Sequence, residues 1–111
     1  MATSKITYQG ELRTKCIHLQ SGTEILTDAP TDNHGKGEAF SPTDLVATAL
    51  ASCMISILGI QANTSNIKLG DIDADVTKIM SANPRKISEI VVVMNFTNHQ
   101  YSEKEKTILM N

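Results

Sequence analysis

The sequence predicts a single domain in which one long buried helix lies among antiparallel strands, and three observations support this. The first is an apolar segment, residues 41–62, in which few polar side chains interrupt the apolar run. The second is the alternation of apolar and polar residues on both sides of that segment. The third is a length of 111 residues with 41% hydrophobic content, which fits one globular domain with an adequate core.

The central segment, Ser41 to Ala62, has a well-specified helix start. Ser41 can act as the N-cap, Pro42 suits the first helical position, and Asp44 completes a capping box. The helix has no polar face for water, so we expect it to be buried, with Cys53 in its middle. Small residues recur along one side at three- and four-residue steps, so that a second helix could approach there, across a dimer axis. They are Ala49, Ser52, Ser56 and Gly59.

The segments before the helix read as strands and turns. Lys5 to Leu12 alternates as a half-buried strand, and a change of parity afterwards predicts a bulge or turn near Arg13 to Lys15. Ser21-Gly22 indicates a hairpin, followed by an extended segment from Thr23 to Asp28. The composition of the next loop, Pro30 to Gly37, predicts no regular structure.

Two more strands and a short helix are expected after the central helix. Asp71 to Met80 alternates with its aspartates on one side, which predicts a strand with one wet face. Asn83-Pro84 predicts a turn, and Glu89 to Thr97 reads as a more deeply buried strand that pairs antiparallel with the first. Ser102 with a glutamate three residues on forms a second capping box, which begins a helix over residues 104–110.

Composition excludes several classes of partner. A net charge of −2, a pI near 5.8 and the lack of a basic run give no footprint for nucleic acid or anionic lipid. The N-terminal residues lack the apolar core of a signal peptide, and two cysteines are too few for a disulfide framework, so we expect a cytoplasmic protein. The apolar segment lacks basic flanks, so we do not expect it to span a membrane. No cofactor motif is present, since Gly35-Lys36-Gly37 has neither phosphate-binding nor dinucleotide-binding spacing.

Cys53 has two interpretations from its position alone. In a helix interior it can be a small buried hydrophobic residue, or it can be a nucleophile if a cation stabilises its thiolate. It lies about three turns from the helix N-terminus, where the helix dipole contributes little, so another segment must supply the charge. The chain has two arginines, Arg13 and Arg85, and spacing assigns neither.

The remaining candidate ligands do not form a metal site. Cys16 and His18 could face the same side of a strand, but this pair is far short of the four ligands of a zinc site. His34 and His99 have no partners nearby in the sequence, which favours solvated side chains. We therefore expect no bound metal.

The stretch GKGEAFSPTDLVATALASCM resembles the signature of the OsmC/Ohr family, thiol-dependent peroxidases that reduce organic hydroperoxides. Pro42 and Cys53 stand eleven residues apart, as in that family, and the similarity extends over TDAPTDNHGKG and NPRKISEIVV. The resemblance implies an α+β fold in which an antiparallel sheet wraps around two central helices. It also implies an intertwined homodimer with the active site at the subunit interface, and a small hydrophobic peroxide as substrate.

The resemblance also implies roles for three residues. Cys53 would be the peroxidatic cysteine, which becomes a sulfenic acid. Arg13 is the best match to the arginine that the family supplies from its N-terminal region. Asp44 is the carboxylate near the proline, although the family has its acidic residue directly after the proline, where Thr43 stands here. On a straight helix Asp44 would lie about 13 Å from Cys53, so it would act through an arginine or from the other subunit.

The family places a resolving cysteine in its second central helix, and this chain ends before that point. We therefore expect a single OsmC-like domain over residues 1–111 that lacks most of the second central helix and the C-terminal strand. Reduction of Cys53 would then depend on an external thiol. The alternative is an OsmC-like domain without peroxidase activity, in which Cys53 packs, or binds a small ligand.

Overall fold

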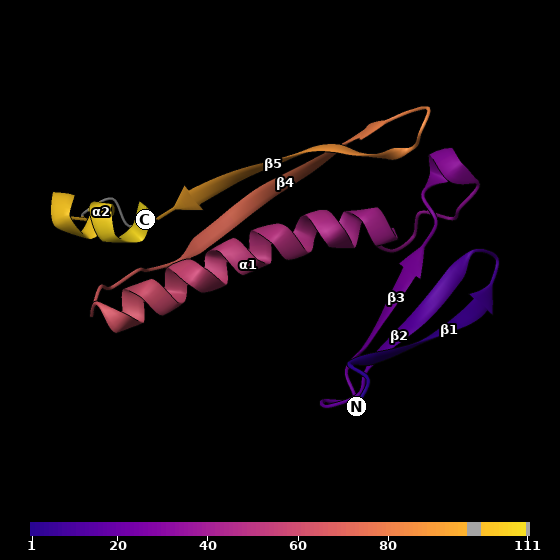
Figure 1. Ribbon diagram of the computed structural model, residues 1–111, viewed down its shortest axis with the longest axis horizontal. Coiled ribbons are helices and arrows are strands. Elements are labelled where there is room, and N and C mark those ends of the chain that lie inside the picture. The colour runs from indigo at the N-terminus through magenta and orange to yellow at the C-terminus, as the bar shows by residue number, and fades with distance from the viewer. Residues whose placement is uncertain (98–100, 111) are drawn as a thin grey trace. The chain divides into compact units, whose positions relative to one another are not determined.

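The protein mixes antiparallel sheets with a long helix, as an α+β fold (Figure 1). The structure is a computed structural model and describes residues 1–97 and 101–110. It divides into two compact units, Met1–Val46 and Ala47–Asn111, and each is described by itself. The strands form two antiparallel sheets, one with three strands and one with two.

The first unit holds a three-stranded antiparallel sheet in the order β1 (Ser4–Gly10), β2 (Arg13–His18) and β3 (Glu24–Asp28). Three consecutive residues with positive φ, at positions 10–12, turn the chain from β1 into β2. The predicted change of direction near Arg13 is therefore present slightly earlier, and Arg13 is the first residue of β2. The hairpin at Ser21-Gly22 is confirmed, since the Gly22 N–H donates to the His18 carbonyl oxygen at 2.7 Å.

Two predictions for the first unit are wrong. The strand β1 is not half-buried, since Ile6 and Tyr8 are both more than 60% exposed in the single chain. The loop after β3 is not wholly irregular, because it contains a 3₁₀ turn, η1 (Thr31–Asn33). The Pro30 carbonyl oxygen, which accepts the N–H groups of Asn33 and Gly35 at 2.9 Å each, stabilises that turn.

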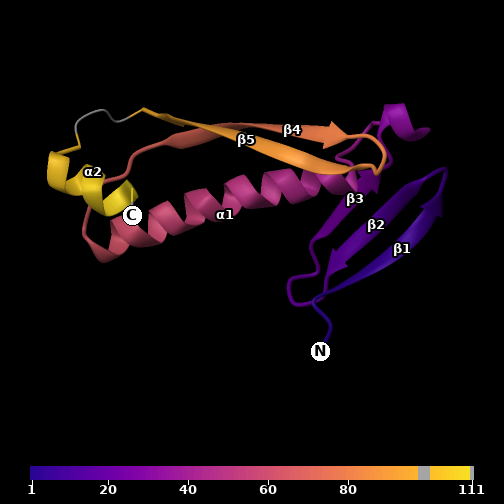
Figure 2. The ribbon, with the colours of Figure 1, turned by 45° about the horizontal axis from the view of Figure 1, so that its top comes forward.

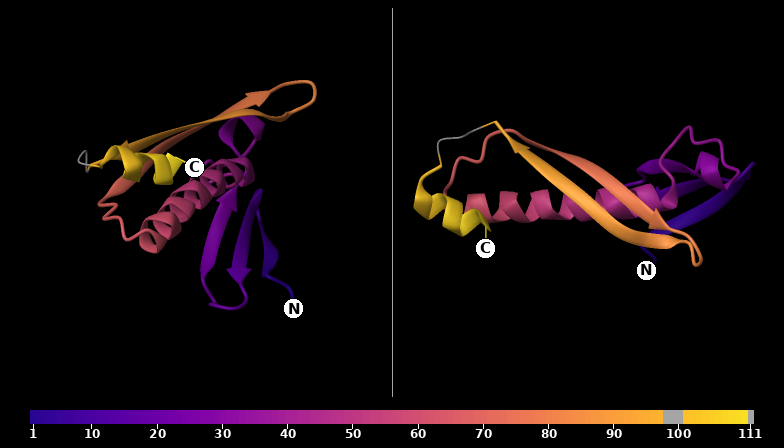
Figure 3. Two further views of the ribbon diagram at one scale, coloured as in Figure 1. Left: turned by 60° about the vertical axis from the view of Figure 1, so that its left-hand side comes forward. Right: turned by 90° about the horizontal axis from the view of Figure 1, so that it is seen from above.

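The helix α1 (Pro42–Thr64) begins in the first unit and runs on into the second. There it is joined by β4 (Ile72–Ser81), β5 (Lys86–Phe96) and α2 (Glu103–Met110). Figures 1 and 2 show the ribbon of β4 and β5 running alongside α1, and Figure 3 shows α2 beside the far end of α1. The predicted antiparallel pairing of the two strands is confirmed.

The faces of this ribbon differ from the prediction in one respect. The aspartates Asp71, Asp73 and Asp75 are exposed, as expected for a wet face. The strand β5, however, is not more deeply buried than β4, because both alternate between half-buried and exposed residues. A two-stranded ribbon with α1 on one side only leaves its other face open to solvent.

The core is small, and α1 is less buried than the sequence predicts. The apolar side chains that are fully buried in the described residues are Ala47, Ala51, Ala62, Ile67 and Leu109. Within the second unit, the ribbon and α2 lie along one side of α1, whose buried residues are Ala47, Ala51 and Ala62. Within the described residues, α1 is also the one helix long and apolar enough to cross a membrane, a test that core helices of soluble proteins pass as well.

A compact cluster fixes the end of α1. Ala62, Ile67 and Leu109 pack together, which joins α1 to α2. The ring of Tyr101 meets that of Phe96 edge-on, with centroids 6.1 Å apart, and its hydroxyl donates to the Leu69 carbonyl oxygen. The predicted capping box of α2 is confirmed and holds its first turn in place.

Candidate functional site

Cys53 is an exposed free thiol halfway along α1. It is flanked on the same side of the helix by large apolar residues at three- and four-residue steps, which are also exposed. We call this set the apolar stripe: Leu50, Cys53, Ile57 and Ile60. The nucleophile candidate therefore stands in the middle of an uncovered hydrophobic surface.

The small residues predicted to admit a second helix lie next to the apolar stripe and are also uncovered. Ala49, Ser52 and Ser56 are exposed, and a Cβ added at Gly59 would meet nothing within 4 Å. The side of α1 that bears Cys53 thus has room for a closely packed neighbour.

Arg13 and Asp28 form a two-point ion pair across β2 and β3. The guanidinium Nε and Nη2 atoms donate to the two Asp28 carboxylate oxygens at 2.7 and 2.8 Å. The two residues are directly opposite in the strand register. The Asp28 side chain is fully buried, while that of Arg13 is 28% exposed. This geometry fixes the plane of the guanidinium as well as its position.

The ion pair keeps both groups charged. The hydrogen bonds from Arg13 hold the pKa of Asp28 below its usual value, although burial acts in the opposite direction. The same hydrogen bonds raise the pKa of Arg13. Asp28 is therefore a carboxylate, and Arg13 a cation, at every pH near neutrality.

Asp28 also organises the loop that leads to α1. Its carboxylate accepts the Glu38 N–H at 3.1 Å, and its own N–H donates to the Phe40 carbonyl oxygen at 3.1 Å. The exposed Glu38 carboxylate lies 3.7 Å from Arg13 Nη2, a weaker second contact. Gly35 permits the fold of this loop, since a Cβ there would overlap the Ala29 carbonyl oxygen.

A second ion pair ties the same loop to the turn before Arg13. Lys36 bonds to Glu11, and this hydrogen bond lowers the pKa of Glu11 and raises that of Lys36. The Ala29 N–H donates to the Leu12 carbonyl oxygen at 3.0 Å nearby. The surroundings of Arg13 are therefore held by contacts on both sides.

Asp44 caps α1. Its carboxylate accepts the Ser41 N–H at 3.0 Å, and its own N–H donates to the Ser41 hydroxyl at 3.1 Å, which is the reciprocal pattern of a capping box. The predicted helix start is thus confirmed, and the contacts of this carboxylate account for its place near the proline.

The structure does not test the predicted site as a whole. Arg13 and Asp44 belong to the first unit and Cys53 to the second, and each is described within its own unit. The joint role of these three residues remains a prediction.

The other candidate ligands have ordinary surroundings. Cys16 is half-buried in β2, and His18 bonds through Nδ1 to the Ser21 hydroxyl at 2.6 Å. His34 is exposed at the end of η1, and His99 lies outside the described residues. Over residues 1–97 and 101–110, no group of three potential ligands is placed to hold a metal ion.

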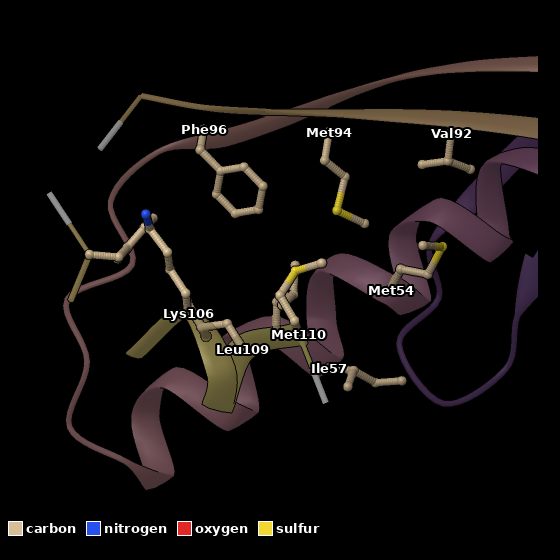
Figure 4. Close-up of a pocket in the computed structure, with 10 residues that line it drawn as sticks. Met54, Ile57, Val92, Met94, Phe96, Lys106, Leu109 and Met110 are labelled. Atoms are coloured by element: carbon tan, nitrogen blue, oxygen red, sulfur yellow. The ribbon is translucent and has the colours of Figure 1, made fainter. Parts of the chain in front are cut away.

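The second unit contains an open apolar cavity of about 810 Å³ between α1, β5 and α2. Figure 4 shows Met54 of α1 and Met110 of α2 opposite Met94 and Phe96 of β5, with Lys106 of α2 at one side. Cys53 is not among the lining residues, although its neighbour in the sequence, Met54, is. The cavity has the size and the mainly apolar walls of a small-molecule site.

Sequence reasoning missed Asp28 and Glu38. The sequence places Asp28 only at the end of an extended segment. Its ion pair with Arg13 depends on the register of β2 and β3, which puts the two residues opposite each other. The hairpin at Ser21-Gly22 carried that information, because folding the chain there brings the start of β2 to the end of β3. An uncertainty of one residue in the position of the turn makes this pairing unpredictable, since neighbouring residues in a strand face opposite sides of the sheet.

An α+β fold with antiparallel sheets, and a cysteine on the exposed side of a long helix, define the class of protein to which this chain is similar. Residues 35–110, more than half of the chain, match the family of OsmC-like proteins. The chain belongs to that family. Among curated proteins, none matches.

Solved structures similar to the chain include the following three. A protein from Psychrobacter arcticus 273-4, provisionally named an osmotic stress induced and detoxification response protein, is 55% identical, with a TM-score of 0.92 over 99% of this chain and 80% of that one. The organic hydroperoxide resistance protein OsmC of Legionella pneumophila is 18% identical, with a TM-score of 0.68 over 99% and 81%. A Vibrio cholerae O1 biovar eltor protein provisionally named an organic hydroperoxide resistance protein, with captopril in one active site, is 15% identical, with a TM-score of 0.65 over 99% and 76%. The last two likenesses show the fold alone.

Proposed function

We propose that this protein reduces organic hydroperoxides with Cys53 as the peroxidatic residue. The observation that carries the proposal is the match of residues 35–110 to the OsmC-like family, which includes the whole segment from Pro42 to Cys53. The 55% identical Psychrobacter protein, named for a detoxification response, supports it. In the single chain Cys53 is exposed, so its own subunit does not enclose the thiol.

The chemistry has two steps. The Cys53 thiolate attacks one peroxide oxygen, so that an S–O bond forms, the O–O bond breaks, and the other oxygen leaves as an alcohol once it takes a proton. Sulfur is thereby oxidised to a sulfenic acid. An external dithiol then condenses with the sulfenic acid, releasing water and forming a mixed disulfide, and its second thiol displaces Cys53. The cytoplasm, where we place the protein, supplies such reductants.

Arg13 is the cation that we assign to the Cys53 thiolate. The family supplies its arginine from the N-terminal region, and the ion pair with Asp28 keeps Arg13 charged and oriented. A cation near a thiol favours the thiolate and so raises its reactivity. Asp44 acts on α1 through its capping contacts, which fix the first turn of the helix that carries Cys53.

We further propose that the protein functions as a homodimer, with the apolar stripe buried by the partner. The stripe is exposed in the single chain, although Ile57 also lines the cavity, and the adjoining small residues leave room for a close helix. An exposed apolar surface of this kind on a soluble protein commonly marks an interface. A partner packed on the stripe would surround Cys53 with apolar side chains. Such surroundings would favour a small hydrophobic peroxide over water.

A peroxide-consumption assay tests the catalytic proposal. Purified protein should consume cumene hydroperoxide in the presence of a dithiol, and Cys53→Ser should not. Cys16→Ser is the matched control and should retain the activity, because Cys16 lies in β2 away from α1 in the sequence. If the native protein shows no consumption that depends on Cys53, the proposal is wrong.

The cavity favours one alternative, binding of a small apolar ligand without peroxide chemistry. Its walls come from α1, β5 and α2, and Cys53 is absent from the lining. This alternative would be favoured if the native protein is inactive toward peroxide and a fluorescent apolar probe binds native protein and Cys53→Ser equally well. Met94→Lys should weaken that binding, since it places a charge in the apolar wall.

A further inference from the structure

We propose that Asp28, and not Asp44, is the carboxylate that positions Arg13 for the reaction of Cys53. The inference rests on the proposed function, because it assigns Arg13 to the thiolate of Cys53. It goes beyond that function by identifying a residue on β3 that the signature around Pro42 does not contain.

The contacts of Asp28 are those of an orienting group. Both of its oxygens accept from Arg13, so the guanidinium can neither rotate about its long axis nor move along the strand without breaking a bond. Its burial excludes water that would compete for those bonds. The N–H of Glu38 is a third donor to the carboxylate, and it fixes the carboxylate in turn.

The ion pair leaves part of the guanidinium for another acceptor. Asp28 occupies the edge formed by Nε and Nη2, and Glu38 approaches Nη2. In the part of the chain that the structure describes, no residue accepts a hydrogen bond from Nη1 of Arg13. An arginine held by one edge offers the N–H groups of the other edge in a fixed direction.

The neighbouring charges do not substitute for Asp28. The charged groups around Arg13 are Asp28, Glu38, Glu11 and Lys36. Glu38 and Glu11 have largely exposed side chains, and Glu11 is bonded to Lys36. An exposed carboxylate contributes little orientation because solvent screens it and its side chain moves freely. Asp44, by contrast, is engaged at the start of α1.

The test measures how the rate of Cys53 alkylation by iodoacetamide depends on pH. This reports the thiolate fraction and needs no peroxide, and Cys16→Ser is the background throughout. We expect Asp28→Asn to raise the midpoint by about one pH unit, which lowers the rate at neutral pH about tenfold. Arg13→Ala should give the same shift, and adding Asp28→Asn to Arg13→Ala should change nothing further, since the two residues act as one unit.

Two further variants separate positioning from folding. Arg13→Lys keeps the charge and leaves Asp28 intact but cannot make the two-point contact, so it should behave as Arg13→Ala does. Glu24→Gln breaks the exposed pair with Lys15 in the same sheet and should leave the alkylation profile unchanged. Circular dichroism checks that each variant is folded, and Arg13→Lys alone decides the question if Asp28→Asn does not fold.

The outcomes distinguish this inference from the proposed function. If the native protein consumes peroxide and Arg13→Ala slows Cys53 alkylation, while Asp28→Asn or Arg13→Lys matches the native protein, Asp28 does not position Arg13. The same conclusion follows if Asp28→Asn shifts the profile further in the Arg13→Ala background. If the native protein consumes no peroxide through Cys53, the proposed function fails first, and the inference fails with it.

Discussion

Replacing Ile60 with alanine should weaken the proposed homodimer. Ile60 is 64% exposed in the single chain and belongs to the apolar stripe. The change removes three carbon groups, each worth about 0.8 kcal/mol when buried, of which roughly two thirds remain to be buried by a partner. A symmetric dimer feels the substitution twice, which gives a loss of about 3 kcal/mol. The dissociation constant should therefore rise on the order of 100-fold.

Sedimentation equilibrium over a wide range of protein concentration measures this change. Alanine favours a helix more than isoleucine does, so a weaker dimer cannot be blamed on a weaker α1. Ile6→Ala is the matched control, because Ile6 is 63% exposed but lies in β1. A native protein that stays monomeric at about 100 μM, well above the Kd of a stable complex, would refute the reasoning. So would an Ile60→Ala protein that dimerises as strongly as the native one.

Three other changes have expected outcomes. Ser41→Ala removes the acceptor of the Asp44 N–H and should lower the free energy of unfolding by about 1 kcal/mol in urea titrations, whereas Thr64→Ala, at the other end of α1, should have little effect. The pKa of Asp28 is lowered by Arg13, so its stabilising effect is present above the unfolded value of about 4 and is lost as pH falls through the folded value. Melting temperatures of the native protein should accordingly fall on acidification more steeply than those of Asp28→Asn, and parallel curves would contradict this. Peroxide without a thiol should convert Cys53 to acids with two and three added oxygens, and mass spectrometry that finds Cys53 unchanged would count against its reactivity.

Local signals in the sequence located the secondary structure well. Ser41, Pro42 and Asp44 specified the start of α1 because capping depends on side chains within one turn of each other. The alternation of aspartates in β4 predicted its exposed face because strand periodicity is fixed by the backbone. Both predictions use interactions between residues that are neighbours in the sequence.

Burial was predicted less well because it depends on what covers an element. The run from Leu45 to Ala62 has no polar face, which led to the expectation of a buried helix, yet Ile57 and Ile60 are exposed in the single chain. An apolar composition predicts that the surface of α1 is covered, but it does not predict whether the same chain or a partner covers it. The same limit applies to β1, whose apolar residues Ile6 and Tyr8 are exposed in the single chain.

The site could be predicted only in part for a related reason. Cys53 was found through a signature that lies on one helix, whereas the Arg13–Asp28 pair depends on the register of two strands. Asp44 lies close to Pro42 in the sequence, and its contacts include those of a helix cap, while its place in the site stays a prediction. A carboxylate such as Asp28, whose contact with Arg13 is set by strand pairing, cannot be recognised from its neighbours in the sequence.

The small core has a consequence for how stable the protein is at different concentrations. Among the described residues, three of the five buried apolar side chains are alanines, and each alanine contributes little apolar area. If association covers the apolar stripe, much of the free energy of folding comes from the contact between chains. Mass action then lowers the stability of the dimer by about 1.4 kcal/mol for each tenfold dilution, so the melting temperature should depend on how much protein is present.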